Sequence, residues 1–102
     1  MKNRYCVILT TTDKKEVADG ITYKLLEMNL AACVQFDNIT SFFKWEGKPS
    51  EAKEIRLIIK AKSDNYKDIE KVISSLHNYK IQQIIKLDIS EGLPAYLNWL
   101  DS

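Results

Sequence analysis

The stretch Leu30–Lys48 reads LAACVQFDNITSFFKWEGK and says more about the fold than any other part of this chain. Only four of its nineteen residues carry a formal charge, and three of those four lie at its end. Small, β-branched and apolar residues come first, and two phenylalanines and a tryptophan follow, which is typical of extended chain with aromatic side chains on both faces. We therefore predict one long strand, with a bend or bulge at Asp37-Asn38.

The segments before this stretch predict a strand and a helix. Tyr5–Thr11 has apolar residues on both alternating faces, as a central strand does. Apolar residues then recur at helical spacing and predict a helix over about residues 14–28. Asp13 is expected to be its N-cap, with Glu16 completing a capping box.

The segments after this stretch predict a hairpin and three further elements. In chain order, these are a turn at Gly47–Ser50, a strand over Glu54–Lys62, a helix capped by Ser63 or Asp64 and closed by His77, a strand over Ile85–Ile89, and a helix opened by Pro94. The order β-α-β-β-α-β plus a terminal helix is that of the α+β, ferredoxin-like split β-α-β sandwich. The length of 102 residues fits a single domain over residues 1–102.

One face of the predicted sheet would lack a cover. In this fold the helices pack on one face and leave the other open to water in a monomer. Here the open face would expose Phe42 or Phe43, together with Trp45 and Ile58. Because an apolar patch of more than a few hundred Å² usually marks an interface, we expect a closed homo-oligomer in which the long hairpin reaches a neighbouring subunit.

Charge and cysteine content bear on partners and location. Fifteen basic and fourteen acidic residues leave a net charge of +1, which argues against nucleic-acid and membrane-surface partners. The apolar run Tyr5–Leu9 is too short for a signal-peptide core, and no segment approaches the length of a membrane span. Cys6 and Cys33 both lie in apolar runs, which favours reduced, buried thiols over a disulfide. We therefore expect a cytoplasmic protein.

Six short segments carry a resemblance that covers most of the chain. They are Leu30–Val34 (LAACV), Ser41–Lys48 (SFFKWEGK), Leu57–Lys60 (LIIK), His77–Tyr79 (HNY), Ile84-Ile85, and Tyr96–Leu100 (YLNWL). In order and spacing they resemble the CutA family of divalent-cation tolerance proteins. The resemblance implies a homotrimer of ferredoxin-like subunits, related in architecture to the PII signalling proteins, with strands that continue from one subunit into the next. It also implies a part in the response to divalent metals, copper in particular, without an agreed reaction.

The resemblance also points to functional residues. His77 and Tyr79 fall on the family's His-Pro-Tyr motif, and Cys33 falls on the cysteine of Ala-Ala-Cys. An inter-subunit cleft or binding site would be lined by Trp45, Glu46, Lys48, Glu54, Lys60 and Tyr79, and the trimer interface would include Phe42, Phe43, Trp45 and Trp99. For the charged members of the cleft, cross-strand ion pairing on an exposed hairpin is the alternative.

The chain departs from the family around His77. Asn78 replaces the proline of the motif, Lys80 replaces an acidic or polar residue, and Gln82-Gln83 replaces Pro-Glu. Loss of two prolines is expected to loosen the loop. Replacing carboxylate by amide or ammonium is expected to weaken a divalent-cation site there.

Two residues are candidate metal ligands, each with a structural alternative. His77 could ligate Cu(II) or Zn(II), but a specific site needs three or four donors, which would have to be gathered between subunits. The alternative is a helix-terminal histidine that interacts with the last carbonyls of its helix. Cys33 would be a soft ligand for Cu(I), and the alternative is that it fills space in the core.

No motif for catalysis is present: the chain has no glycine-rich phosphate loop, no Cys-x-x-Cys and no His-x-x-x-His. We therefore expect a binding protein and no enzyme. Our working hypothesis is weak binding of a divalent cation, with Cu(II) first, at an inter-subunit site that involves His77. The alternatives are a PII-like trimer that binds a small anionic metabolite through Lys48, Lys60 and Lys80, and a trimeric scaffold without a ligand.

Overall fold

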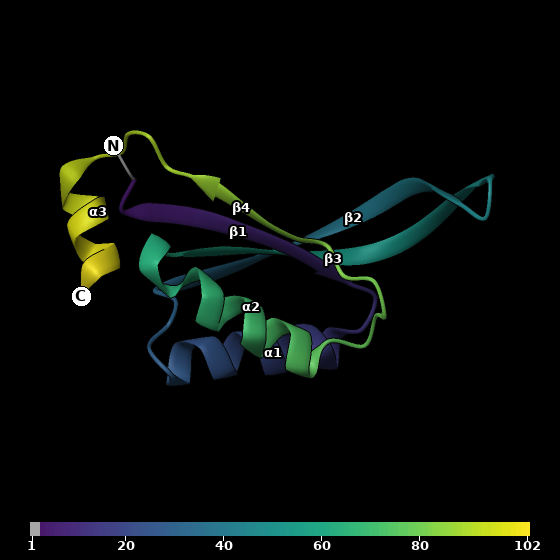
Figure 1. Ribbon diagram of the computed structural model, residues 1–102, viewed down its shortest axis with the longest axis horizontal. Helices are drawn as coiled ribbons and strands as arrows, with labels where there is room; N and C mark the ends of the chain where they lie inside the picture. The colour runs from purple at the N-terminus through teal and green to yellow at the C-terminus, as the bar shows by residue number, and fades with distance from the viewer. Residues whose placement is uncertain (1–2) are drawn as a thin grey trace.

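The chain forms one four-stranded antiparallel sheet in the order β2-β3-β1-β4, with helices against it (Figure 1). The computed structural model describes residues 3–102. Its elements are β1 (Tyr5–Thr12), α1 (Lys15–Glu27), β2 (Cys33–Trp45), β3 (Lys48–Lys62), a 3₁₀ turn (Ser63–Asn65), α2 (Tyr66–Leu76), β4 (Ile84–Asp88) and α3 (Pro94–Asp101). The predicted α+β fold with ferredoxin-like element order is confirmed.

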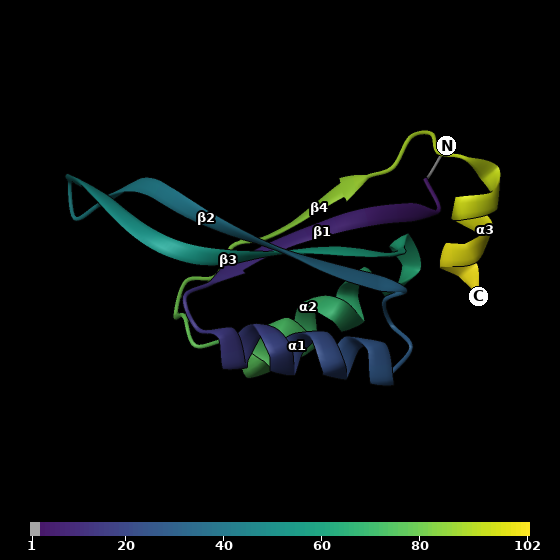
Figure 2. The ribbon, with the colours of Figure 1, turned by 180° about the vertical axis from the view of Figure 1, so that it is seen from behind.

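The core lies between the sheet and the two long helices. Both views show α1 and α2 on the same side of the sheet (Figures 1 and 2). Alternate residues of the two central strands point toward these helices and are fully buried with the inner residues of α1 and α2: Cys6, Ile8, Leu57, Ile59, Ile21, Leu25, Ile69 and Ile73. Burying each large aliphatic side chain contributes about 1.5–3 kcal/mol. The prediction that Cys6 packs in the core is confirmed.

The predicted caps of the two long helices are wrong. Lys14 is the N-cap of α1 and makes no side-chain cap bond, while the Asp13 carboxylate accepts a hydrogen bond from Asn78 instead. Before α2, the Ser63–Asn65 turn provides the first helical residues, and Asn65 is the N-cap without a side-chain cap bond. The Asn65 side chain donates to the Leu30 carbonyl, so tertiary contacts have taken the polar groups that local capping would use.

The hairpin of β2 and β3 is longer and more regular than predicted. The pairing register runs unbroken from Cys33 opposite Lys60 to Trp45 opposite Lys48, so no bulge interrupts the strand at Asp37-Asn38. The turn has only two residues, Glu46 at φ +51° and Gly47 at φ +79°, which is the left-handed pair that a type I′ turn requires. Strand β3 therefore begins at residue 48, not at residue 54.

Pro49 lies inside β3, at a position where it costs no ladder hydrogen bond. The pair that closes a two-residue hairpin is hydrogen-bonded, and pairs alternate from there along the ladder. Lys44 opposite Pro49 is the next pair, so the nitrogen of Pro49 faces away from β2. Beyond the end of β1 that edge has no neighbouring strand in the described part of the chain, as expected for proline in a sheet.

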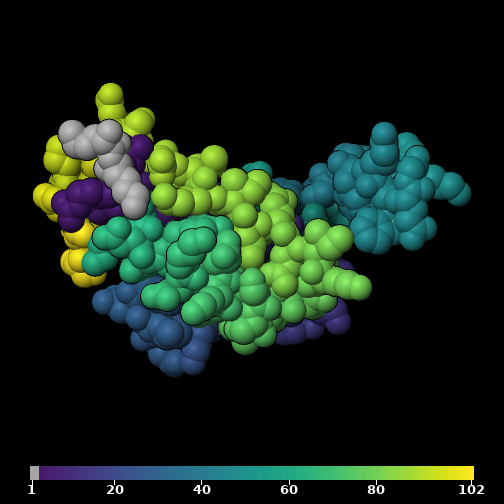
Figure 3. Space-filling view, in the orientation of Figure 1, coloured from purple at the N-terminus to yellow at the C-terminus, as the bar shows by residue number. Residues whose placement is uncertain are grey.

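The hairpin projects far beyond the rest of the sheet. The last residue of β1, Thr12, pairs with Ile55, and β3 continues for seven more residues with β2 as its only partner within residues 3–102. In the space-filling view these residues form a separate teal lobe (Figure 3). The described residues consequently measure 44 × 26 × 22 Å, which is long for so short a chain.

Helix α3 lies at the end of the molecule opposite the hairpin tip (Figure 2). Asp101 fixes it there: its carboxylate accepts hydrogen bonds from the Tyr5 hydroxyl at 2.6 Å and from Arg4 at 3.0 Å. The sheet face away from α1 and α2 carries the half-buried residues Val7, Leu9 and Ile58, and we call it the open face. None of the helices within residues 3–102 is long and apolar enough to cross a membrane.

Candidate functional site

A groove of about 920 Å³ separates the projecting hairpin from the loop between α2 and β4. Its walls are Ser41, Phe42, Phe43 and Trp45 of β2, Ser50, Ala52 and Glu54 of β3, Thr11 of β1, and Asn78–Ile81 and Gln83 of the loop. Most of the exposed lining is apolar. The groove brings together the aromatic end of the hairpin and the His77 loop, which are distant in the sequence.

His77 is the C-cap of α2, and both of its ring nitrogens are engaged. Nε2 lies 2.8 Å from the carbonyl oxygen of Thr11, to which it donates, and Nδ1 accepts a hydrogen bond of 3.0 Å from the backbone N–H of Tyr79. The predicted structural alternative had the imidazole on the last carbonyls of its own helix, whereas its partner is a carbonyl of β1. A metal ion on either nitrogen would have to replace one of these bonds.

Asn78 ties the loop to the end of β1. Its Oδ1 accepts a hydrogen bond of 2.6 Å from the Thr12 hydroxyl, and its Nδ2 donates one of 2.8 Å to the Asp13 carboxylate. Gln82 adds a bond of 3.2 Å from its Nε2 to the carbonyl of Tyr79. The sequence predicted that loss of two prolines loosens this loop, but the residues that replace them make side-chain hydrogen bonds that offset this loss.

Tyr79 joins the loop to the hairpin. Its hydroxyl donates a hydrogen bond of 2.7 Å to a carboxylate oxygen of Glu54, and its ring lies 4.9 Å from that of His77, tilted by 49°. Partial burial and the bond to the Glu54 carboxylate raise the pKa of Tyr79 above its usual value, because both disfavour the phenolate. Of the six predicted cleft residues, these two are in direct contact.

Of the other predicted cleft residues, Trp45 lines the same groove, whereas Glu46, Lys48 and Lys60 do not. Trp45, Glu46 and Lys48 surround the turn at the hairpin tip. Lys60 lies twelve residues from Lys48 on the same strand, about 40 Å away at the rise of an extended chain. Its ammonium group lies 5.5 Å from the ring centre of Tyr96. Within one subunit Glu46, Lys48 and Lys60 therefore do not converge with Glu54 and Tyr79 on a small ligand.

The two predicted metal ligands also lie apart. Cys33 begins β2 opposite Lys60 and is half-buried, whereas the His77 ring contacts Thr11, whose partner on β3 is Arg56. Four residues of extended chain, about 13 Å, separate those two positions on β3. Within residues 3–102 no group of three or more histidine, cysteine, aspartate or glutamate side chains is placed to hold a metal ion.

The four predicted interface residues are all exposed in the subunit. Their exposed fractions are 76% for Phe42, 43% for Phe43, 55% for Trp45 and 50% for Trp99. Register places Phe43 and Trp45 on the open face and Phe42 on the opposite one. The open face continues across β4, where Ile85 and Leu87 are also exposed.

One charged pair on the open face was missed from the sequence. Arg56 donates a hydrogen bond of 2.8 Å to the Asp37 carboxylate, and the two residues are direct partners in the β2–β3 ladder. Their opposite charges would have revealed the pair had a register between the two strands been predicted. The Arg56 Nε has no acceptor within residues 3–102.

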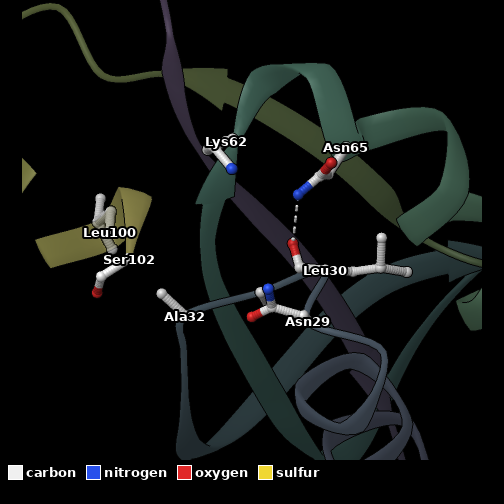
Figure 4. A pocket seen from close by; sticks show the side chains of 8 residues that line it. Asn29, Leu30, Ala32, Lys62, Asn65, Leu100 and Ser102 are labelled. Atoms are coloured by element: carbon white, nitrogen blue, oxygen red, sulfur yellow. Dashed lines mark hydrogen bonds between the residues drawn. The ribbon is translucent and has the colours of Figure 1, made fainter. Parts of the chain in front are cut away.

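A second, much smaller cavity lies near the other end of the sheet (Figure 4). It measures about 20 Å³, enough for one water molecule, and is lined by Asn29–Ala32, Lys62, Asn65, Leu100 and Ser102. The side chain of Asn65 donates a hydrogen bond of 3.1 Å to the Leu30 carbonyl, drawn as the dashed line in Figure 4. Its volume limits it to a structural role.

Comparisons with known proteins agree with this architecture. The family model described as CutA1 divalent ion tolerance protein matches residues 6–102. The divalent-cation tolerance protein CutA of Archaeoglobus fulgidus is 37% identical over 94 residues, and that of Thermus thermophilus is 36% identical over 95 residues, each match covering 92% of both chains.

Solved structures support the same relation. The structure of the periplasmic divalent cation tolerance protein CutA from Archaeoglobus fulgidus superposes with a TM-score of 0.91 at 36% identity, covering 95% of each chain. CutA1 from Shewanella sp. SIB1 gives a TM-score of 0.93 at 29% identity, covering 99% of this chain and 95% of that one. With a family match over nearly its whole length and relatives this similar, the chain belongs to the CutA1 divalent ion tolerance family.

Proposed function

We propose that this chain forms a homotrimer and takes part in tolerance of divalent cations by binding an ion rather than by catalysis. The observation that carries the proposal is the open face, on which Phe43, Trp45, Ile85 and Leu87 are exposed in a single subunit. A soluble protein rarely leaves so much apolar side chain in contact with water unless another chain covers it. The number of three subunits follows from the resemblance to the family.

Sedimentation equilibrium tests the assembly. We expect a mass near three times the 11.8 kDa of one chain at micromolar concentration. Leu87→Lys places a charge on the open face and is expected to shift the mass toward one chain, because a buried unpaired ammonium group is costly. Tyr23→Lys, at an exposed aromatic site on α1 away from the open face, is the control and should leave the mass unchanged. A wild-type protein with the mass of one chain would contradict the trimer.

We propose that the cation binds weakly and between subunits. Weak binding is supported by the hydrogen bonds that already occupy both ring nitrogens of His77, because a metal ion must replace one of them. An inter-subunit location is supported by the lack of a three-donor cluster within residues 3–102 of one subunit. Cu(II) is the first ion to test because imidazole suits it well.

Calorimetric titration of Cu(II) into the assembled protein tests this site. His77→Ala is expected to lose the measured binding, while Cys33→Ala serves as the comparison for a soft ligand. Equal affinities of the wild type and His77→Ala would remove His77 from the site. Loss of binding in Cys33→Ala alone would move the site to the start of β2.

We also propose that the protein works in the cytoplasm. Cys6 and Cys33 are both free thiols, which suits a reducing compartment. The relative from Archaeoglobus fulgidus is described as periplasmic, which differs from the location that we propose for this chain. Fractionation of cells, with the chain detected by antibody, decides between the two compartments.

A further inference from the structure

The hairpin leaves the sheet at Glu54. Residue 55 is the last of β3 to pair with β1, so Glu54 is the first that has β2 alone as its partner strand within residues 3–102. A two-stranded ribbon is only marginally stable by itself and twists more freely than a wider sheet. Its direction relative to the sheet must therefore be set by whatever contacts its stem.

Tyr79 makes that contact. Its hydroxyl donates 2.7 Å to the Glu54 carboxylate, at the point where support from β1 ends. The ring is partly buried and lies against the ring of His77. A hydrogen bond to an ionised acceptor is among the stronger kinds in a protein, so this contact is well suited to hold the stem.

The loop that carries Tyr79 is itself held by the last residues of β1. The His77 ring donates to the Thr11 carbonyl, and the Asn78 side chain joins the Thr12 hydroxyl and the Asp13 carboxylate. Three side-chain hydrogen bonds thus join His77 and Asn78 to the end of β1 and to the residue after it. A fourth, at His77 Nδ1, joins this histidine to the backbone N–H of Tyr79, the residue that contacts the hairpin.

We propose that residues 77–79 form a brace that extends the support of β1 to the hairpin stem, with Asn78 as the positioning residue that sets Tyr79 against Glu54. The brace fixes the direction in which the hairpin presents Phe43 and Trp45. The benefit of this for assembly rests on the trimer proposed above, whereas the brace itself is a property of one subunit.

The backbone around Asn78 gives the proposal a second test. His77 has φ −72° and ψ +147°, the extended conformation that a residue before proline adopts. Among the backbone hydrogen bonds of the described residues, none uses the N–H of Asn78. Proline at position 78 therefore costs no backbone hydrogen bond and suits the conformation of His77, and it would restrict the loop while removing both side-chain bonds.

Hydrogen exchange measured by mass spectrometry tests the brace. The measurement uses the full chain in the Leu87→Lys background, so that assembly does not shield the hairpin. Asn78→Ala and Tyr79→Phe are each expected to raise exchange in residues 39–53 by roughly two- to tenfold, the worth of a typical hydrogen bond, without raising it in β1. A role in general stability would instead raise exchange in all strands together.

Three variants serve as controls and rescue. Lys80→Ala changes the same loop at a residue without a hydrogen bond in the described structure, and should exchange like its parent. Glu54→Gln keeps an acceptor for the Tyr79 hydroxyl and should exchange more slowly than Glu54→Ala. Asn78→Pro should lie nearer to the parent than Asn78→Ala does.

The outcomes separate this proposal from the proposed function. Unchanged hairpin exchange in both Asn78→Ala and Tyr79→Phe overturns the brace, as does an equal increase in β1 and the hairpin. Exchange in Asn78→Ala equal to that in its parent, with faster exchange in Tyr79→Phe, overturns the positioning role of Asn78. A wild-type mass of one chain removes the trimer, and the exchange results then still decide the brace.

Discussion

The two halves of β3 follow different physical rules, although they form one continuous strand that pairs with β2 from Lys48 to Lys60. Residues 55–62 pair with β1, and up to Lys60 also with β2; this half lies under α1 and α2 and buries Leu57, Ile59 and Ala61. Residues 48–54 pair with β2 alone and contain no buried residue. Local pairing and a favourable turn are thus enough to extend a strand. Only the half that packs against the helices becomes part of the core.

We expect the two halves of β3 to contribute differently to the stability of the subunit and to its binding of partners. The free energy of unfolding of a subunit should depend on the half under the helices, where apolar area is removed from water. The projecting half should affect mainly what the subunit can bind. Substitutions matched between the two halves test this separation.

The largest difference is expected between truncations of Ile59 and Phe42. Ile59→Ala should lower the free energy of unfolding by about 2–5 kcal/mol, because it leaves a cavity under α1 and α2. Phe42→Ala, on the exposed hairpin, should change the free energy of the subunit by less than about 0.5 kcal/mol. Urea unfolding at several protein concentrations measures both and separates subunit stability from assembly. A cost for Phe42→Ala equal to that for Ile59→Ala, independent of concentration, would contradict the separation.

Glycine-to-alanine substitutions should have opposite effects on stability in the projecting hairpin and in helix α1. Gly47→Ala forces a Cβ into the left-handed conformation at φ +79° and should destabilise the hairpin by about 1–2 kcal/mol. Gly20→Ala lies inside α1 with open space around the new Cβ, and should stabilise the protein by about 0.5–1 kcal/mol. Thermal unfolding of both variants measures the pair. A stabilising Gly47→Ala would contradict the type I′ geometry of the turn.

The smallest effect on stability is expected at alkaline pH and involves two tyrosines. Tyr66 packs against the core, and Tyr79 contacts the projecting half of β3. The hydrogen bond to Glu70 and burial raise the pKa of Tyr66 on α2 from 10.0 to about 12, and the pKa of Tyr79 is also raised. The native state therefore holds both protons more tightly than the unfolded chain does. Their stabilising contribution is complete below pH about 10 and is lost as the pH rises through the folded pKa.

Urea unfolding between pH 9 and pH 12 checks this sign. Tyr66→Phe and Tyr79→Phe should each lose less stability over that range than the wild type, because each removes one titrating group. Lysines titrate in the same range in all three proteins, so only differences between proteins are compared. A steeper loss in either variant would contradict the assigned direction.

The sequence predicted the order and type of the elements well because their periodicity is strong. Helix α1 was expected over residues 14–28 and runs from Lys15 to Glu27, and Pro94 opens α3 as predicted. The ends of the elements were less accurate. The predicted caps failed because Asp13 bonds to Asn78, which is distant in the sequence, and no local pattern reveals that partner.

The candidate site was predictable in part. Tyr79 and Glu54 were both expected near a cleft and are in contact, but His77 was considered mainly as a ligand and is engaged in hydrogen bonds within the subunit. The role of Asn78 was missed, because its side chain acts through the end of β1, which precedes it by more than sixty residues.

The sequence by itself determined the family, the order of strands and helices, and the apolar character of Leu30–Lys48, since these depend on spacing and composition along the chain. The tertiary structure alone decided that the strand after Glu46-Gly47 continues unsupported beyond β1, and that the loop after His77 meets it there. The physical reason is that periodicity records which face of an element is buried, whereas the length of a neighbouring strand and the partner of a polar side chain depend on the packing of distant segments.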